Sequence, residues 1–290
     1  MRRTTARDYR CPYSGDALEL QADSADGPEV REGGLISSRG RRYPIRDGVP
    51  RLIDHGRESF GEAEKEQYEQ YQASSDSYDL GVDWLVRFFR EDEAALRNRV
   101  HDLLELRPDS RVLETGCGTC RDSVHLARRL GPGGELFLQD LSANMLELGR
   151  RRMASERAGD EGGCRVEFFE GNAAHLPFAD GFFDAAYHFG GLNFFSDKRR
   201  ALAEMTRVVR RGGKVVFGDE GLAPWLRNTP YASTLTSLGE HYLHLAPVDL
   251  LPDCAQDVSV RWVAGNAYYV IAYRVGDGPP QPDLELVITR

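Results

Sequence analysis

The sequence lacks any apolar run approaching the roughly 18 residues that a membrane-spanning helix needs. Its basic N-terminal stretch, MRRTTARDYR, is not followed by an apolar segment, so a secretory signal is not expected. Cysteine is scarce: there are five, an odd number, and a chain of 290 residues can form a core without disulfides. These absences predict a reducing, cytoplasmic compartment and no membrane contact.

Positively charged residues are also fewer than negatively charged ones. The chain has 37 Lys and Arg against 46 Asp and Glu, a net charge of -9, which disfavours a broad electrostatic interface with nucleic acid or anionic lipid. Hydrophobic residues make up 41% and charged residues 29%, a composition that is typical of globular proteins and excludes wholesale disorder. At about 150 residues per domain, the length predicts two domains, or one large domain with an appendage.

Three parts follow one another along the chain. Residues 1–58 combine nearly balanced charge with short apolar stretches at 17–20, 34–36, 42–45 and 50–53, which predicts a small β module. Residues 59–107 are expected to be linking helices that cover a cofactor site, one ending near 74–76 and another running from 84 to 106. Residues 108–290 form the third part.

Strand and helix patterns alternate in this third part. Apolar strands are predicted at 111–115, 135–140, 165–169, 183–187 and 213–217, and helices at 122–130, 142–153 and 198–209. Such alternation predicts an α/β fold with a parallel sheet covered on both faces. Residues 221–257 are an insertion, 258–263 and 268–273 predict a hairpin, and 284–288 predict a further strand.

A glycine-rich turn, ETGCGTCR at residues 114–121, follows the first of these strands. Gly116 and Gly118 let the backbone bend sharply and let a ligand approach the next helix. The dinucleotide-binding pattern G-x-G-x-x-G is incomplete, because Arg121 occupies its last position. Glu114, at the carboxyl end of the strand, suits a cationic ligand better than a phosphate.

Two further positions indicate an adenosyl ligand. Asp140 ends the second strand, where a carboxylate accepts hydrogen bonds from two ribose hydroxyls, and Asn172 follows the third, where an amide can pair with an adenine edge. A ligand with adenine, ribose and a cationic tail but no phosphate is S-adenosylmethionine (SAM), which is the predicted cofactor. Asp140 could instead cap the helix beginning near Ser142, and Asn172 could be a plain turn residue.

Residues 111–220 resemble the core of the class I SAM-dependent methyltransferases in five stretches: VLETGCGT (112–119), QDLSANML (139–146), EGNAAHLPF (170–178), FFDAAY (182–187) and VVRRGGKVV (208–216). The resemblance implies a Rossmann-like fold with a seven-stranded, mostly parallel sheet whose last strand is antiparallel. It implies that the glycines line the methionine moiety and that Asp140 holds the ribose. The implied cofactor-binding residues are Glu114, Gly116, Cys117, Gly118, Asp140, Leu141, Met145, Asn172, Ala173, His188 and Phe189.

The sequence departs from this family at two positions. Cys120 stands where the family usually has a third glycine, and Asn172 where it usually has an aspartate. Both are compatible with SAM, because an asparagine carbonyl still accepts a hydrogen bond from an amine. Cys117 and Cys120 also form a C-x-x-C pattern, which could be a redox pair at a helix N-terminus, although nothing thioredoxin-like surrounds it.

The N-terminal part resembles the small zinc-ribbon domain related to the activator subunit of tRNA and protein methyltransferases, in residues 11–15 (CPYSG) and 40–53 (GRRYPIRDGVPRLI). Zinc-bearing members use two C-x-x-C pairs. Here only Cys11 remains, because Ser14, Ile36 and Arg39 occupy the other ligand positions. Lacking thiolates, the module is expected to hold no metal. Its role could be purely structural, or it could be substrate gating, dimerisation or scaffolding.

Methyl transfer requires a base only if the acceptor has a proton to lose. The candidate catalytic residues are His188, after the fourth strand, and Asp219 and Glu220, after the fifth, because ligands of open α/β sheets lie beyond the strands' carboxyl ends. His188 could be a base or a fixed residue beside the cofactor, and the two acids could contact the acceptor or cap the next segment. The 221–257 insertion is expected to be a lid that selects the acceptor; its aromatic and histidine residues are Trp225, Tyr231, His241, Tyr242 and His244.

The leading hypothesis is a SAM-dependent methyltransferase that transfers a methyl group to an O, N or C atom of a small metabolite or natural product. The alternatives are a tRNA or protein methyltransferase, a catalytically silent SAM-binding scaffold, and a nicotinamide oxidoreductase. A monomer or a homodimer is expected.

Overall fold

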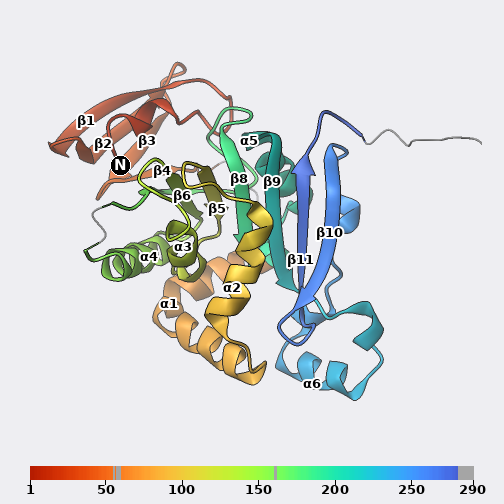
Figure 1. Cartoon of the computed structure of the whole chain (residues 1–290). Helices are drawn as coiled ribbons and strands as arrows, with labels where there is room; N and C mark the ends of the chain where they lie inside the picture. The colour runs from red at the N-terminus through yellow and green to blue at the C-terminus, as the bar shows by residue number, and fades with distance from the viewer. Residues whose placement is uncertain (55, 57–59, 160–161, 280–290) are drawn as a thin grey trace, which may run out of the picture.

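The computed structural model describes residues 1–54, 56, 60–159 and 162–279. Its strands form one mixed sheet in the order β1-β2-β3-β4-β7-β6-β5-β8-β9-β11-β10 (Figure 1). The strand bounds are β1 Leu18–Asp26, β2 Glu29–Ser37, β3 Arg42–Arg46, β4 Val49–Leu52, β5 Arg111–Thr115, β6 Glu135–Asp140, β7 Arg165–Gly171, β8 Phe183–Phe189, β9 Val209–Glu220, β10 Ala255–Val263 and β11 Tyr268–Val275. The helices are α1 Glu62–Phe88, α2 Glu93–His101, α3 Arg121–Ala127, α4 Ala143–Glu156, α5 Lys198–Val208 and α6 Pro230–Leu238.

The centre of the sheet is parallel and apolar on both faces. Leu113 and Phe137 belong to a buried cluster on one face, and their neighbours Val112 and Leu136 belong to a buried cluster on the other. Helices α3 and α4 cover one side and α5 the other, as Figure 1 shows. Strands that are buried on both faces have near-continuous apolar sequences. These runs are the signal from which the alternation of strands and helices was correctly predicted. Because β6 and β7 lie on one side of β5, and β8 and β9 on the other, a crevice opens at the carboxyl ends of these strands.

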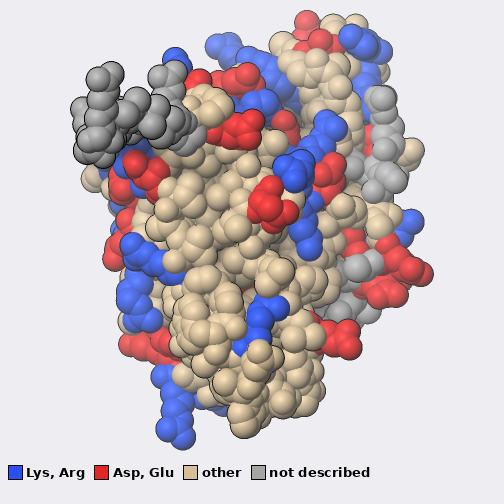
Figure 2. Space-filling view, turned by 90° about the vertical axis from the view of Figure 1, so that its right-hand side faces the viewer, with Lys and Arg blue, Asp and Glu red and all other residues tan. Residues whose placement is uncertain are grey.

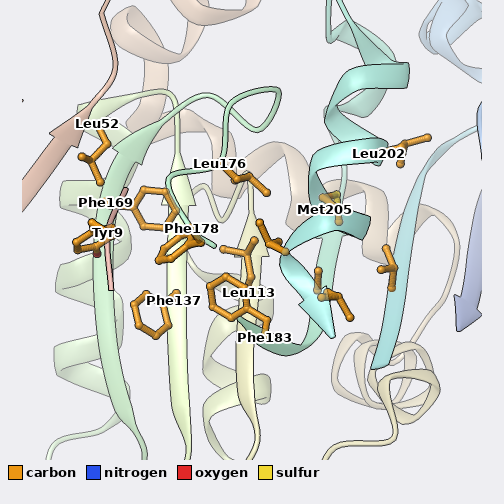
Figure 3. Packing of buried hydrophobic residues seen from close by; sticks show 14 of the residues in the cluster. Tyr9, Leu52, Leu113, Phe137, Phe169, Leu176, Phe178, Phe183, Leu202 and Met205 are labelled. Atoms are coloured by element: carbon orange, nitrogen blue, oxygen red, sulfur yellow. The ribbon is translucent and has the colours of Figure 1, made fainter. Parts of the chain in front are cut away.

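Among the described residues the sheet has eleven strands, so the expected number of seven is not confirmed. Strand β4 pairs in parallel with β7, at Leu52 opposite Gly171, so β1–β4 extend the sheet beyond β7. Tyr9 is fully buried, with its ring 5.8 Å from that of Phe169 and 5.3 Å from that of Phe178 (Figure 3). Residues 1–53 therefore share one core with the rest of the chain.

No zinc ribbon is evident in the described part of the N-terminal module. The Sγ atom of Cys11 lies 3.1 Å from the Tyr43 hydroxyl, and Ser14 donates a hydrogen bond to Asp16 (2.9 Å). The described residues contain no cluster of three or more His, Cys, Asp or Glu side chains that could hold a metal ion. The predicted boundary at residue 58 lies outside the described residues.

The linking helices differ from the prediction in where they break. Helix α1 continues past residues 74–76, because the segment contains no proline and each Ser or Asp costs a helix only about a few tenths of a kcal/mol. The predicted helix at 84–106 is divided after α1, where Arg90 has a φ of 53° and the Asp92 side chain accepts the amide hydrogen of Ala95 to begin α2. The strand predicted at 284–288 lies outside the described residues. Among the described helices, α1 included, none is both long and apolar enough to cross a membrane.

Candidate functional site

Two cavities meet at the glycine-rich turn after β5. The larger has a volume of about 580 Å³ and the smaller about 80 Å³, and both are lined by Tyr78, Gly116, Gly118, Gly190 and Gly191. The larger is also lined by predicted site residues Glu114, Cys117, Phe189 and Glu220. The smaller is also lined by Asp140, Leu141, Met145, Asn172, Ala173 and His188. Of the predicted set, Asp219 is the residue that lines neither cavity.

The glycine-rich turn brings backbone amides to the point where the cavities meet. Gly116 and Gly118 have φ values of 62° and 51°, in the left-handed region that glycine adopts without strain. A side chain on Gly116 would also meet the His188 ring, because its Cβ would lie 3.0 Å from Cε1. Cys120 has a φ of 62° as well, so a non-glycine residue occupies the third left-handed position.

Asp140 connects this turn to the turn that begins α4. Its Oδ2 accepts the amide hydrogen of Gly118 and its Oδ1 that of Ser142, both at 2.8 Å. Burial raises the pKa of Asp140 to about 6. The N-cap of α4 is Ser142, whose Oγ accepts the amide hydrogen of Met145 (3.3 Å). Asp140 is therefore not the cap of that helix, and its carboxylate faces the small cavity.

Asn172 fits both of its predicted interpretations. Its Oδ1 accepts the amide hydrogen of Ala174 at 2.8 Å, which is the contact of a turn residue. Asn172 and Ala173 also line the small cavity, together with Leu141 and Met145.

Glu114 is a buried carboxylate in the wall of the larger cavity. Its Oε2 is shielded from solvent and has no hydrogen-bond partner in the described structure. Burial, and next the carboxylate of Asp122, raises the pKa of Glu114 well above its usual value. Because a buried, unpaired carboxylate is costly, this atom is suited to a cationic hydrogen-bond donor in the cavity.

A charged network behind the turn was not predicted from the sequence. Asp122 accepts hydrogen bonds from His101 (3.0 Å) and Tyr187 (2.9 Å) and forms a buried ion pair with Arg97. Although burial opposes it, the Arg97 guanidinium lowers the pKa of Asp122. Arg97 and Arg121 share Glu93, at 2.8 and 2.6 Å, and both arginines line the larger cavity. In the sequence, Arg121 stands out only because it occupies the last glycine position of the dinucleotide-binding pattern. Arg97 carries no local signal.

Helix α1 is attached to this network by two carboxylates, Asp79 and Asp83, and Asp83 forms an ion pair with Arg121 (2.6 Å). Asp79 accepts a hydrogen bond from the Thr119 hydroxyl (2.8 Å) and forms ion pairs with Arg121 and Arg152. These contacts fix α1 where Tyr78 lines both cavities.

His188 is fixed by the backbone beneath the glycine-rich turn. Its Nδ1 lies 2.8 Å from the carbonyl oxygen of Thr115, which can only accept, so Nδ1 carries the hydrogen. Burial lowers the pKa of His188 to about 4, so the imidazole is neutral near pH 7. It lines the small cavity and not the larger one, which favours the fixed residue over the base.

Asp219 and Glu220 are the last two residues of β9, and their carboxyl groups are linked by a side-chain hydrogen bond. Asp219 is fully buried and accepts the amide hydrogens of Asn193 (2.6 Å) and Glu220 (2.8 Å). Burial, and then the neighbouring Glu220 carboxylate, raises the pKa of Asp219 well above its usual value. Asp219 thus positions the loop after β8, whereas Glu220 faces the larger cavity.

The 221–257 insertion covers the open side of the larger cavity only in part. His241 lines the cavity, whereas Trp225, Tyr231, Tyr242 and His244 do not. Trp225 is 64% exposed and packs edge-on against Trp262, with ring centroids 5.2 Å apart. Figure 2 shows the face that carries this insertion, and its lower part is mostly uncharged, in keeping with the absence of charged residues from 228 to 239.

The chain is similar to known proteins over this region. Residues 112–213 match the family model described as "Methyltransferase domain". Over 153 residues the chain is 35% identical to the demethylmenaquinone methyltransferase of Bacillus cytotoxicus and 33% to that of Bacillus cereus strain ATCC 10987, covering 53% of this chain and 61% of each relative. The chain therefore matches about three fifths of the length of these relatives.

A solved structure shows the same fold over a longer stretch. It is that of phosphoethanolamine N-methyltransferase 2 of Haemonchus contortus in complex with SAM, with a TM-score of 0.53 and 13% identity, covering 81% of this chain and 62% of that one. The likeness confirms the Rossmann-like fold. The family match over residues 112–213 agrees with what the five motifs predicted, namely similarity to methyltransferase domains.

Proposed function

We propose that the chain is a methyltransferase that takes its methyl group from SAM and transfers it to a small molecule. The observation that carries the proposal is the pair of cavities at the glycine-rich turn. One is bounded by Asp140 and the other by Glu114, whose Oε2 has no hydrogen-bond partner among the described residues. The curated relatives, whose names give a demethylmenaquinone as the acceptor, support a small-molecule substrate.

The residues present fit SAM. Asp140 would accept the ribose hydroxyls, and Asn172 and Ala173 would meet the adenine in the small cavity. Glu114 would accept a hydrogen bond from the ammonium of the methionine moiety, which satisfies its unpaired oxygen. When bound, SAM supplies a methyl group activated by a sulfonium.

The chain's own contribution is positioning and exclusion of water. Apolar side chains of α1 and α2 form much of the larger cavity: Val82, Leu85, Val86, Phe89 and Leu96. Such a wall holds an acceptor in line with the methyl group and removes competing water. Glu220 is the residue placed to hold or take up a proton of the acceptor, and we do not assign that role to His188 because it lines the other cavity.

The N-terminal module is proposed to be structural. It adds four strands to the edge of the sheet, and its Tyr9 fills the core between Phe137 and Phe178. The Thr5 hydroxyl donates to the buried Glu167 carboxylate at 2.6 Å. By pairing with β7, the module covers a strand that would otherwise be an edge strand and that Asn172 follows directly.

The test is transfer of labelled methyl groups. The purified chain is incubated with methyl-labelled SAM and, separately, a metabolite extract, a tRNA pool and a protein extract. The proposal expects label in the small-molecule fraction. Label in RNA or protein alone would identify the macromolecular alternative, and tight SAM binding without label in any fraction would identify a silent SAM-binding scaffold.

A further inference from the structure

The larger cavity is richer in carboxylates than a cofactor with a single net positive charge requires. Its described lining includes six acids against two arginines. The acids are Glu66, Glu91, Glu93, Glu114, Asp122 and Glu220, and the arginines are Arg97 and Arg121. The ion pairs of these side chains show which charged group is available to bind the acceptor.

Both arginines are already neutralised. Arg97 forms ion pairs with Asp122 and Glu93, and Arg121 with Glu93 and Asp83. An acceptor with a carboxylate or phosphate would therefore have to displace a carboxylate of the chain from an arginine before it found a cation.

Glu220 remains as a carboxylate within the cavity. Glu91 pairs with Arg99 (3.2 Å), Glu66 is exposed, and Glu114 lies beside the turn that the cofactor would occupy. No ion pair of the described residues engages Glu220. Its backbone is held, because its amide donates to Asp219 and its carbonyl accepts from the Asn193 side chain (2.8 Å each).

Aromatic rings surround this carboxylate. Tyr268 lies opposite Glu220 in the β9–β11 pairing, and its ring stacks on Phe189 and meets the edge of Phe89, both with centroids 5.9 Å apart. Tyr78 enters from α1. Burial, and next the Glu220 charge, raises the pKa of Tyr78 to about 12, so this hydroxyl stays neutral. A carboxylate among aromatic rings is suited to an organic cation, which gains from both the ion pair and the ring faces.

We propose that the acceptor is a protonated amine attached to an apolar or aromatic body, with its nitrogen held at the Glu220 carboxylate. The inference rests on the proposed function. Glu220 takes a proton from the ammonium; the freed nitrogen lone pair then forms the new N–C bond to the methyl group, while the C–S bond breaks and its electron pair stays on sulfur. The product is the N-methylated ammonium, and the proton on Glu220 passes to solvent.

The experiment compares three phenols of similar size on the full chain loaded with S-adenosylhomocysteine. Tyramine carries an ammonium, 2-(4-hydroxyphenyl)ethanol is neutral, and 3-(4-hydroxyphenyl)propionate carries a carboxylate. Because all three contain the phenol, a site that selects a phenol would not distinguish them. Isothermal titration calorimetry is run on the wild type, on Glu220→Gln and on Glu240→Gln, which removes the charge of an exposed residue outside the cavity.

The proposal expects tyramine to bind the wild type at least about tenfold more tightly than the alcohol, and the propionate to bind most weakly. Glu220→Gln should abolish this preference and leave the affinity for the alcohol unchanged, whereas Glu240→Gln should retain it. Equal binding of amine and alcohol to the wild type, or a preference that survives Glu220→Gln, would overturn the proposal, as would binding of none of the three. Binding of S-adenosylhomocysteine is measured first, because its failure would refute the proposed function instead.

Discussion

Gly149 of α4 gives a direct test of how the glycine-rich turn packs. A Cβ at this position would lie 2.5 Å from the Sγ of Cys120 and 2.9 Å from the carbonyl oxygen of Gly118. The turn can relieve such contacts only by moving. Overpacking of this severity costs up to about 3 kcal/mol, and alanine regains about 1 kcal/mol of helix propensity. Gly149→Ala is therefore expected to destabilise the chain by about 2 kcal/mol, which lowers Tm by roughly 4–8 °C.

The control is Gly81→Ala, in the exposed part of α1, where a Cβ would meet nothing within 4 Å. There only the propensity acts, and Tm should rise. Thermal unfolding followed by circular dichroism gives both values. A Gly149→Ala variant as stable as the wild type would refute this description of the turn.

A double-mutant cycle identifies the atom responsible. Cys120→Gly removes the Sγ and places glycine at a φ of 62°, where it is unstrained. Combined with Gly149→Ala it should recover about half of the lost stability, because the contact with the Gly118 oxygen remains. Strict additivity of the two single changes would show that Cys120 and Gly149 do not compete for space.

Three further outcomes are expected. Burial raises the pKa of Asp140 to about 6, and ribose hydroxyls donate hydrogen bonds best to the ionised carboxylate. The affinity for S-adenosylhomocysteine, measured by calorimetry, should therefore rise between pH 5 and 7 and then level off. Asp140→Asn should remove this pH dependence. Arg97→Ala removes the ion-pair partner of the buried Asp122 and should lower the free energy of unfolding in urea by about 3–5 kcal/mol. Arg99→Ala, at an exposed pair, should lower it by less than about 1 kcal/mol, and equal effects would contradict the buried network. Tyr9→Ala should lower the free energy of unfolding by about 3–5 kcal/mol. Tyr9→Phe should leave it nearly unchanged, because the buried hydroxyl has no hydrogen-bond partner among the described residues, and a large loss of stability in Tyr9→Phe would contradict this.

The part of the site that the sequence predicted is built from local signals. Gly116 and Gly118 mark a backbone that must turn at the end of a strand, and Asp140 and Asn172 each follow an apolar strand directly. Once parallel strands are inferred, their carboxyl ends meet at one edge of the sheet. These positions were therefore predicted without knowledge of any distant contact.

The part that was missed depends on contacts between distant segments. Arg97 lies on a short, polar helix where an arginine resembles a solvated surface residue, and its burial follows only from the packing of α2 over Asp122. The direction of Asp219, away from the cavity, depends on the pairing of β9 with both neighbours. The parallel pairing of β4 with β7 likewise depends on contacts between distant segments. Neither strand carries a local sequence signal for this pairing.

Calorimetric titration of the purified chain with S-adenosylhomocysteine and, separately, NAD tests most directly whether the turn and Asp140 hold a phosphate-free adenosyl ligand. We expect one molecule of S-adenosylhomocysteine bound per chain and no heat from NAD. Asp140→Ala should weaken binding by at least about tenfold, and Asp109→Ala, at an exposed carboxylate before β5, should not change it. Binding of NAD in preference to S-adenosylhomocysteine, or full affinity in Asp140→Ala, would contradict the account.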